Sequence, residues 1–313
     1  MIPPERVVPA AQHLEVVTGA FGYTGKYITR RLLGMGRRVK TLTGHPDRMN
    51  PFGRQVSAEP LCFDDPGRLA ESLKGARTLY NTYWVRFARR RVTFEAAVEN
   101  SGKLVQACRE AGVARIVHVS ITNVSVDSSL PYFRGKGIVE RLVIDSGLSY
   151  AILRPTVIFG AEDILINNMA WLLRRFPIFA LPGSGDYRLQ PVFVEDLAEL
   201  AVRAAEASNN LIQDAVGPEI YTFEQLVRRI AETIHSRAKL VHLPPWLALS
   251  LSRSIGWMVR DVVLTRDEVE GLMANLLVSQ GPPTGQTRLS EWLARNAGTV
   301  GRNYASEINR HFR

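Results

Sequence analysis

The chain has 313 residues, of which 46% are hydrophobic, so it can bury a core of domain size, and this composition excludes a disordered protein. The net charge of +9 indicates a nucleic-acid partner, an anionic membrane surface or merely an arginine-rich genome, and we favour the last because arginine dominates the 39 basic residues. No nucleic-acid-binding motif accompanies the basic residues, so we expect no nucleic-acid partner.

Residues that could bind a metal or form disulfides are scarce. The two cysteines, Cys62 and Cys108, fall inside a predicted strand and a predicted helix, which argues against a disulfide framework and a metal cluster. No segment approaches the ~20 apolar residues of a membrane-spanning helix, and residues 1–15 lack the apolar stretch of a secretory signal. We therefore expect a soluble, cytoplasmic protein without a metal.

The segment Glu15–Arg38 predicts a buried strand, a glycine-rich turn and an amphipathic helix. Gly19, Gly22 and Gly25 have the spacing at which the backbone turns tightly, approaches a pyrophosphate and packs helix against strand. The helix N-terminus then favours the negative charge of the phosphates. The turn residues that we expect against a dinucleotide are Gly19, Phe21, Gly22, Tyr23, Thr24 and Gly25.

Strands and helices alternate through the first half of the chain. Further strands are expected at Arg38–Thr43, Pro60–Asp64, Ala76–Trp84, Arg115–Ser120 and Ser149–Arg154, and helices at Pro66–Lys74 and Arg91–Ala111. The short connections predict an α/β fold of the Rossmann type, a doubly wound parallel sheet covered on both faces. Ligands of such sheets bind beyond the carboxyl ends of the strands.

The loop after the second strand, Gly44–Asn50, bears on the choice of cofactor. An NAD-binding protein usually has an acidic residue about 20 positions past the first glycine, and this position has no carboxylate. We expect NADP(H) before NAD(H), with Lys40, His45 and Arg48 as candidates to neutralise a 2′-phosphate, or else as ordinary loop residues. Asp64, at the end of the third predicted strand, is placed to meet the adenine amino group.

Tyr132 and Lys136 stand four residues apart after the fifth predicted strand, so on a helix they share one face. A lysine ammonium near a phenol favours the phenolate and lowers the tyrosine pKa, as a general acid or base requires. Two positions in the preceding strand and loop, Ser120 and Thr122, carry hydroxyls near the expected nicotinamide.

Beyond residue 160 the periodicity loosens. We expect residues 1–160 to form the NAD(P)-binding domain, with residues 190–206 returning to it, and residues 161–313 to form a smaller substrate lobe. Helices are predicted at Asn167–Phe176, Glu195–Glu206 and Phe223–Ser236. Leu247–Val263 has apolar residues on one helical face; it packs on the lobe, lids an apolar substrate or touches a membrane surface.

The role of one basic cluster is left with alternatives, and the substrate is left unidentified. The cluster Arg86, Arg89, Arg90 and Arg91 is interpreted as a solvated loop face, or else as a site for an anionic substrate group or a partner. Residues 161–313 carry no motif that identifies the substrate, which we expect to be a small molecule.

From residue 14 to about 205 the chain resembles the short-chain dehydrogenase/reductase superfamily in its extended and atypical branches. The motifs that carry the resemblance are TGAFGYTG, Asp64, Asn100 in VENSGKLVQAC, HVSITN, YFRGK, ILRPTVIFG and VFVEDLA, in family order. Within the superfamily it looks most like the NmrA-like and complex I nucleotide-binding accessory subunit group, which also has a motif like LTRDEVEGL.

The resemblance implies an NAD(P)-dependent oxidoreductase or epimerase. It makes Tyr132 the proton donor or acceptor and Lys136 its activator and a ribose ligand, with Arg154 and Pro155 framing the nicotinamide end. One departure is that Ile121 occupies the usual position of a serine or threonine hydroxyl. The alternative is therefore an NAD(P)(H)-binding regulatory or respiratory-complex assembly protein without turnover.

Overall fold

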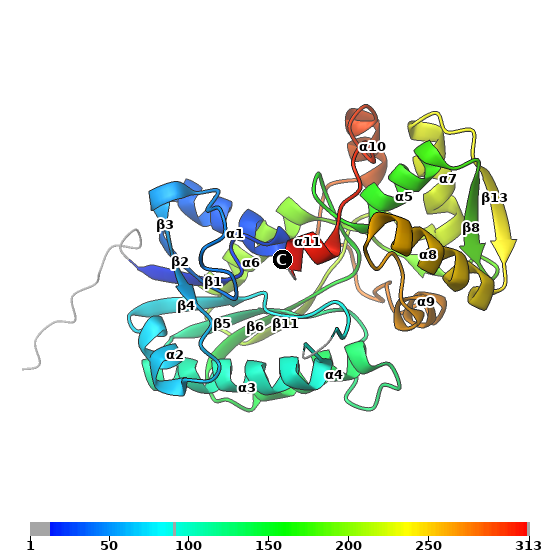
Figure 1. Cartoon of the computed structure of the whole chain (residues 1–313). Coiled ribbons are helices and arrows are strands. Elements are labelled where there is room, and N and C mark those ends of the chain that lie inside the picture. Colours follow the sequence, from blue (N-terminus) through cyan, green and yellow to red (C-terminus); the bar gives the residue numbers. More distant parts are fainter. Residues whose placement is uncertain (1–12, 90–91, 312–313) are drawn as a thin grey trace, which may run out of the picture. The chain divides into compact units, whose positions relative to one another are not determined.

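The computed structural model describes residues 13–89 and 92–311 (Figure 1). The chain forms two compact units. Unit 1 contains the described residues up to Ser120, together with Gly135–Leu153 and Ala198–Gln213. Unit 2 contains Ile121–Arg134, Arg154–Leu197 and the described residues from Asp214 onward.

Unit 1 is built on a seven-stranded sheet in the order β11-β6-β5-β4-β1-β2-β3. Its strands are β1 (Leu14–Thr18), β2 (Arg38–Thr43), β3 (Val56–Pro60), β4 (Ala76–Asn81), β5 (Arg115–Val119), β6 (Ser149–Pro155) and β11 (Leu211–Ala215). From β3 across to β6, each neighbouring pair is parallel. The strand order reverses between β1 and β4, the place where ligands bind in doubly wound folds. The predicted Rossmann-type α/β fold is confirmed.

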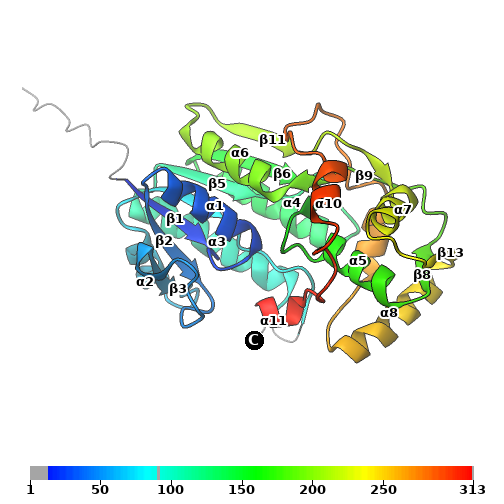
Figure 2. The same cartoon turned by 90° about the horizontal axis from the view of Figure 1, so that it is seen from above.

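Helices cover both faces of this sheet (Figures 1 and 2). One face carries α1 (Tyr23–Gly34) and α6 (Val194–Glu206), and the other carries α2 (Pro66–Leu73), α3 (Phe94–Ala111) and α4 (Pro131–Ile144). On the α2 and α3 side the buried core joins strand residues such as Leu79 and Ile116 to Leu69, Leu104 and Cys108. Apolar side chains at period two in the strands and at helical spacing in α3 explain this layering.

The third strand was misplaced by the sequence pattern. β3 covers Val56–Pro60, after a short 3-10 helix, η2 (Gly53–Gln55), and not Pro60–Asp64. Asp65 explains the shift, because its carboxylate accepts a hydrogen bond from the Arg68 backbone at 3.0 Å and caps α2. The chain therefore turns before the helix, which leaves Asp64 exposed and Cys62 outside any strand.

Unit 2 packs short strands and helices around a second apolar core. Its elements are β7 (Ile158–Phe159), α5 (Leu165–Arg175), β8 (Ile178–Pro182), β9 (Arg188–Leu189), β10 (Val192–Phe193), β12 (Tyr221–Thr222), α7 (Phe223–Thr233), β13 (Lys239–Leu243), α8 (Pro245–Val259), α9 (Arg266–Met273), α10 (Leu289–Asn296) and α11 (Glu307–His311). Phe159, Ile166, Leu181, Leu226 and Leu293 are among its fully buried side chains. The helices predicted near α5 and α7 are confirmed with shifted ends, whereas the parallel pairing of β8 with β13 was not anticipated.

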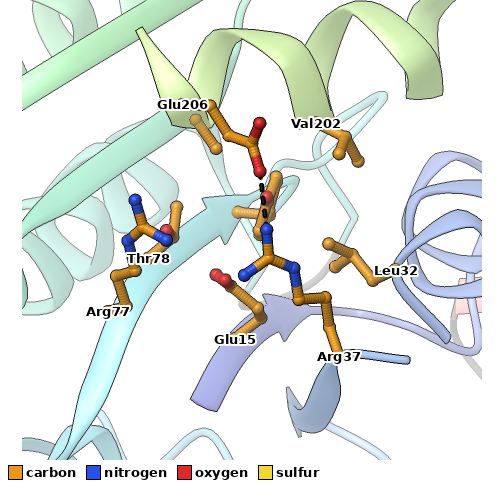
Figure 3. Close-up of a pocket in the computed structure, with 9 residues that line it drawn as sticks. Glu15, Leu32, Arg37, Arg77, Thr78, Val202 and Glu206 are labelled. Carbon is orange, nitrogen blue, oxygen red and sulfur yellow. Dashed lines mark hydrogen bonds and ion pairs between the residues drawn. The ribbon is translucent and has the colours of Figure 1, made fainter. Parts of the chain in front are cut away.

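A small hollow lies at the amino-terminal edge of the unit 1 sheet (Figure 3). Glu15 of β1 lines it and is 3% exposed, and burial raises the pKa of its carboxyl. Arg37 and Glu206 form an ion pair across it at 2.6 Å. Because Glu15 and Thr78 stand near the starts of their strands, this hollow is separate from the carboxyl ends where ligands bind.

Among the helices that the structure describes, none is long and apolar enough to cross a membrane.

Candidate functional site

The glycine-rich turn joins β1 to α1 as a narrow cradle. Gly19 has φ +68°, and a Cβ at Gly25 would overlap the Gly19 carbonyl oxygen and lie 2.8 Å from its carbonyl carbon. A Cβ at Gly22 would stand 3.2 Å from the same oxygen. The left-handed φ favours glycine at Gly19, and the close contacts exclude a side chain at Gly25, whereas Gly22 is tightly packed. The turn therefore brings bare backbone close to any ligand bound there.

The first turn of α1 is available to an anion. Gly22 is the N-cap of the helix, and no side chain of the described chain caps it. The early N–H groups of a helix have no intrahelical partner, and the helix dipole favours negative charge there. Phe21, Tyr23 and Thr24 are partly buried around this end. This arrangement fits a pyrophosphate, as the glycine spacing predicted.

Threonines hold the turn in place. Thr41 of β2 donates to the Val17 carbonyl at 2.8 Å and accepts from the Ala20 N–H at 3.0 Å. On the β4 side, the Thr82 hydroxyl donates to the Thr18 carbonyl at 2.6 Å, and the Thr82 N–H donates to the Thr18 hydroxyl at 2.8 Å. These bonds stop β4 at Asn81 and fix the switch point from both sides.

His45 and Arg48 lie at the two ends of one turn after β2. The Arg48 N–H donates to the His45 carbonyl at 3.2 Å, and the His45 N–H donates to the Thr43 hydroxyl. The Gly19 N–H donates to the Leu42 carbonyl at 2.8 Å, so this loop begins beside the glycine turn. Lys40 is bonded to groups outside this turn, because its ammonium pairs with Glu59 at 2.9 Å and donates to the Ser72 carbonyl at 3.0 Å.

Asp64 and Tyr83 follow β3 and β4. Asp64 is exposed in the turn before α2 and does not end a strand. Tyr83 stacks obliquely on Phe63, with ring centroids 5.0 Å apart, and accepts a hydrogen bond from Asn100 at 3.1 Å. Burial raises the pKa of the Tyr83 phenol.

Hydrogen-bonded polar side chains, which the sequence analysis did not single out, connect the ends of β1, β4 and β5 in the interior. The Asn81 amide oxygen accepts from Thr18 and from the Tyr83 N–H, so its amide nitrogen donates to His118 Nδ1 at 3.2 Å. Burial and the nearby Lys136 charge lower the pKa of His118, which holds the imidazole neutral with its proton on Nε2. Polar residues in otherwise apolar strands, ARTLYN and RIVHV, were the signal for these hydrogen bonds.

The two candidate hydroxyls differ in their surroundings. Ser120 is 4% exposed, and its Oγ has no hydrogen-bond partner among the described atoms. Thr122 is fully buried, and its hydroxyl donates to the Leu276 carbonyl at 3.0 Å. Because His118 and Ser120 are two residues apart, they face the same side of the sheet, and His118 Nε2 also lacks a partner within the described chain. An unpaired buried hydroxyl is costly, so Ser120 is the better candidate to meet a bound group.

Lys136 is deeply buried. It is 3% exposed, its Nζ donates to the Val119 carbonyl at 2.8 Å, and Nζ lies 4.8 Å from the centroid of the Trp84 ring. Burial lowers the pKa of the ammonium to about 7, and the Glu140 carboxylate partly opposes this shift. A lysine poised near neutrality is suited to proton exchange.

Tyr132 precedes Lys136 by four residues on α4, so the predicted helix and the one-turn spacing are confirmed. The Tyr132 ring makes an edge contact with Phe133 at 5.6 Å between centroids.

The predicted site residues are divided between the two units. Unit 2 contains Tyr132, Thr122, Arg154 and Pro155, and unit 1 contains the glycine turn, His45, Arg48, Ser120 and Lys136. Unit 1 alone therefore brings the cradle, the basic turn, Ser120 and Lys136 to the carboxyl ends of its strands.

The arginine cluster is only partly described. Arg86 is half-buried, with its guanidinium 5.8 Å from the Phe87 ring centroid, so it is not part of a fully solvated face. Arg90 and Arg91 lie outside the described residues.

Comparison with known proteins agrees with this geometry. Residues 19–163 match the family model described as NAD(P)H-binding. The mitochondrial NADH dehydrogenase [ubiquinone] 1 alpha subcomplex subunit 9 of Arabidopsis thaliana is 26% identical over 282 residues, which cover 84% of this chain and 70% of that protein. The Rattus norvegicus subunit of the same name is 29% identical over 274 residues, covering 81% and 70%.

Solved structures share the fold. The Citrobacter sp. triphenylmethane reductase complexed with NADP(H) has a TM-score of 0.70 at 17% identity, covering 90% of this chain and 99% of that one. MoeE5 in complex with UDP-glucose and NAD has a TM-score of 0.69 at 20% identity, covering 92% and 98%. At these identities the likeness establishes the fold, and neighbours with either NAD or NADP(H) adopt it.

Gly25→Ala is expected to damage the cradle. The new Cβ would overlap Gly19, so we expect unfolding free energy to fall by ~1–3 kcal/mol and dinucleotide affinity to fall at least ~10-fold. Chemical denaturation and calorimetric titration measure the two effects. Gly34→Ala on the same helix is the control, because its Cβ meets nothing within 4 Å and helix propensity should improve. Equal behaviour of the two variants would contradict the steric argument.

Lys136 should leave a signature in the pH dependence of stability. Its pKa is depressed in the folded state, so the unfolded chain binds the extra proton between pH about 7 and 10.5, and unfolding free energy should rise with pH across that interval. Lys136→Met should flatten this rise, which is on the order of a few kcal/mol, whereas Lys74→Met at an exposed position should retain it. Urea denaturation across this pH range tests the assignment, and an unchanged rise in Lys136→Met would refute it.

Proposed function

We propose that this protein, which belongs to the NAD(P)-binding atypical short-chain dehydrogenase/reductase superfamily, is an NADP(H)-dependent oxidoreductase acting on a carbonyl or alcohol of a small molecule. The observation that carries the proposal is the cradle of Gly19, Gly22 and Gly25 at the uncapped N-terminus of α1. Its bare backbone and its helix dipole suit a pyrophosphate. The NmrA-like assignment within the superfamily and the cytoplasmic location are part of the same proposal.

NADP(H) is favoured over NAD(H) by charge. The loop after β2 offers His45 and Arg48 at the ends of one turn. β2 ends at Thr43 and is followed by Gly44, so no carboxylate stands at the end of the strand. A carboxylate there bonds the ribose hydroxyls of NAD and would repel a 2′-phosphate. Arginine is suited to a phosphate because its planar guanidinium donates two parallel hydrogen bonds. Asp64, exposed in the next loop, is the candidate for the adenine amino group.

The chain's own residues supply the proton chemistry. When bound, the nicotinamide gives or takes a hydride. Tyr132 would give the substrate oxygen a proton in reduction and remove it in oxidation. Lys136, one helical turn away, would favour the phenolate in its ammonium form, and its pKa of about 7 would also let it exchange a proton near neutral pH. Ser120, whose buried hydroxyl has no partner in the described chain, would hold the substrate oxygen in place of the hydroxyl that Ile121 lacks. Arg154 and Pro155 would frame the nicotinamide end.

A second candidate function has its own support. Lys136 is 3% exposed and its Nζ is engaged by the Val119 carbonyl and the Trp84 ring, an arrangement that also serves as a structural core contact. The Arabidopsis thaliana and Rattus norvegicus relatives are subunits named for NADH dehydrogenase. These observations favour a protein that binds the dinucleotide as a structural or regulatory ligand, without turnover.

Arg48→Glu should discriminate between the two cofactors. We expect NADPH affinity to fall at least ~10-fold, because a charge-assisted phosphate bond is replaced by repulsion, with NADH affinity changed less than ~2-fold. Arg54→Glu, at an exposed position in the nearby η2, makes the same charge change as a control. Fluorescence titration of both cofactors measures the preference. Equal losses for NADPH and NADH in Arg48→Glu, or none, would remove Arg48 from the phosphate site.

Tyr132→Phe tests the chemistry. NADPH oxidation is measured with a panel of quinones and nucleotide sugars, the substrate types named for structural neighbours. With a substrate in hand, we expect the variant to lose ~100-fold or more in turnover while binding NADPH as before, since general acid–base catalysis contributes about that factor. Tyr150→Phe, in β6, is the control. Tight NADPH binding with no turnover on any substrate would favour the second candidate, and full activity in Tyr132→Phe would exclude the phenol as the proton donor.

A further inference from the structure

Helix α8 buries small residues and exposes several large apolar ones. Its buried positions are small, Ala248, Ser252 and Gly256, each separated by one helical turn. Four of its large apolar side chains are exposed, whereas Leu247, Leu249, Ile255 and Val259 are partly buried. The exposed fractions are 68% for Trp246, 44% for Leu251, 88% for Trp257 and 55% for Met258. A helix that only covers a core buries its largest apolar residues, so these four exposed side chains are not explained by packing inside unit 2.

The buried face of α8 has its own structural role. Gly256 is packed so closely that a Cβ would come within 2.6 Å of the Asp261 carbonyl oxygen. The helix contacts β8, whose Phe179 and Leu181 point into the core of unit 2, while Ile178 on the other side of the strand is 56% exposed. Small residues thus hold α8 close to the sheet, and its outer face is left for another surface.

The large exposed residues lie along one side of the helix. Trp246 and Trp257 are eleven residues apart, which at 100° per residue brings them within about 20° of each other and separates them by ~16 Å along the axis. Leu251 and Met258 lie ~100–140° further round the helix, beyond the exposed Ser250 and Ser254, so the apolar strip spans the outer half of α8. Arg253, also exposed, lies on the opposite flank, ~20° from Trp246. The strip therefore has tryptophans at both ends and a basic edge.

The segment that contains α8 carries only positive formal charge. Residues 234–260 contain no aspartate or glutamate and carry Arg237, Lys239, Arg253 and Arg260, all exposed. None of these four forms an ion pair with a carboxylate of the described chain. Other helices of unit 2 behave differently, since Arg228, Arg266 and Arg295 each pair with a glutamate one turn away.

The apolar strip and its positive charge together indicate what binds to α8. A second copy of the same strip would bring two unneutralised positive faces together, which opposes self-association. An anionic lipid surface offers negative charge to the arginines and an apolar boundary to the tryptophans, which favour the membrane interface. The helix has 15 residues, ~22 Å, and is too short to span a bilayer, so it would lie in the plane of the interface.

We infer that α8 is a peripheral membrane-docking helix, in which Trp246, Leu251, Trp257 and Met258 enter the interface of an anionic membrane while the neighbouring arginines and Lys239 bind its headgroups. This gives the protein access to an anionic lipid surface through unit 2, and it holds whether or not the chain has enzymatic turnover.

Vesicle co-sedimentation of the full chain tests the inference. Vesicles of phosphatidylcholine alone are compared with vesicles that contain about 30% phosphatidylglycerol, at low and at high salt. We expect at least ~10-fold stronger binding to the anionic vesicles, weakened by salt, with a blue shift of tryptophan fluorescence. Trp246→Glu and Trp257→Glu should each weaken binding ~10-fold or more, and Arg253→Gln about 5-fold.

Ile220→Glu is the matched control, because it introduces the same charge at another exposed apolar position of unit 2, where the side chain is 48% exposed. This variant should bind vesicles like the unmodified chain, and circular dichroism and NADPH titration should be unchanged in all variants. Three results would overturn the inference: no binding to anionic vesicles, binding that the α8 variants leave intact, or a dimer on size exclusion that Trp257→Glu dissociates.

Discussion

The fold of unit 1 depends on the close approach of Gly25 to Gly19. With no Cβ at Gly25, the first turn of α1 packs directly against the end of β1, and the left-handed Gly19 directs the chain into that turn. The N-terminus of α1 therefore points at the place where the strand order reverses. Thr41 and Thr82 then fix the turn from β2 and β4, the two neighbours of β1. A steric condition at one glycine thus positions the whole dinucleotide cradle.

The chemistry at the strand ends rests on burial. Asn81, His118, Ser120 and Lys136 lie within an otherwise apolar layer, where each polar group needs a partner. Asn81 and Val119 supply partners to His118 and Lys136, and burial keeps the imidazole neutral and brings the lysine pKa near neutrality. The Ser120 hydroxyl and His118 Nε2 bond no described atom, and a bound ligand would give the Ser120 hydroxyl a partner.

Much of the fold and part of the site were predictable from local patterns. Strand and helix periodicity, with the glycine spacing, predicted the parallel sheet, the cradle and the one-turn spacing of Tyr132 and Lys136, because these features are encoded within short stretches. Other features depend on distant residues. β8 pairs with β13 across some sixty positions, a contact that has no periodic signal in the sequence. The misplaced third strand is a different case, because the Asp65 cap that begins α2 is a local contact three residues long that strand periodicity does not reveal.

Helix α8 shows most clearly which features the sequence determines and which the tertiary structure determines. The sequence by itself determined that Leu247–Val263 forms a largely apolar helix with arginines, since spacing and composition are local properties. Which side of it faces the protein was decided by tertiary structure. The face with Ala248, Ser252 and Gly256 is buried, and at Gly256 the Asp261 carbonyl oxygen leaves no room for a side chain, so the tryptophans lie on the outer face. In the same way the sequence placed Lys136 one turn from Tyr132, and the surrounding layer of β5 and Trp84 determined its burial and hence its pKa.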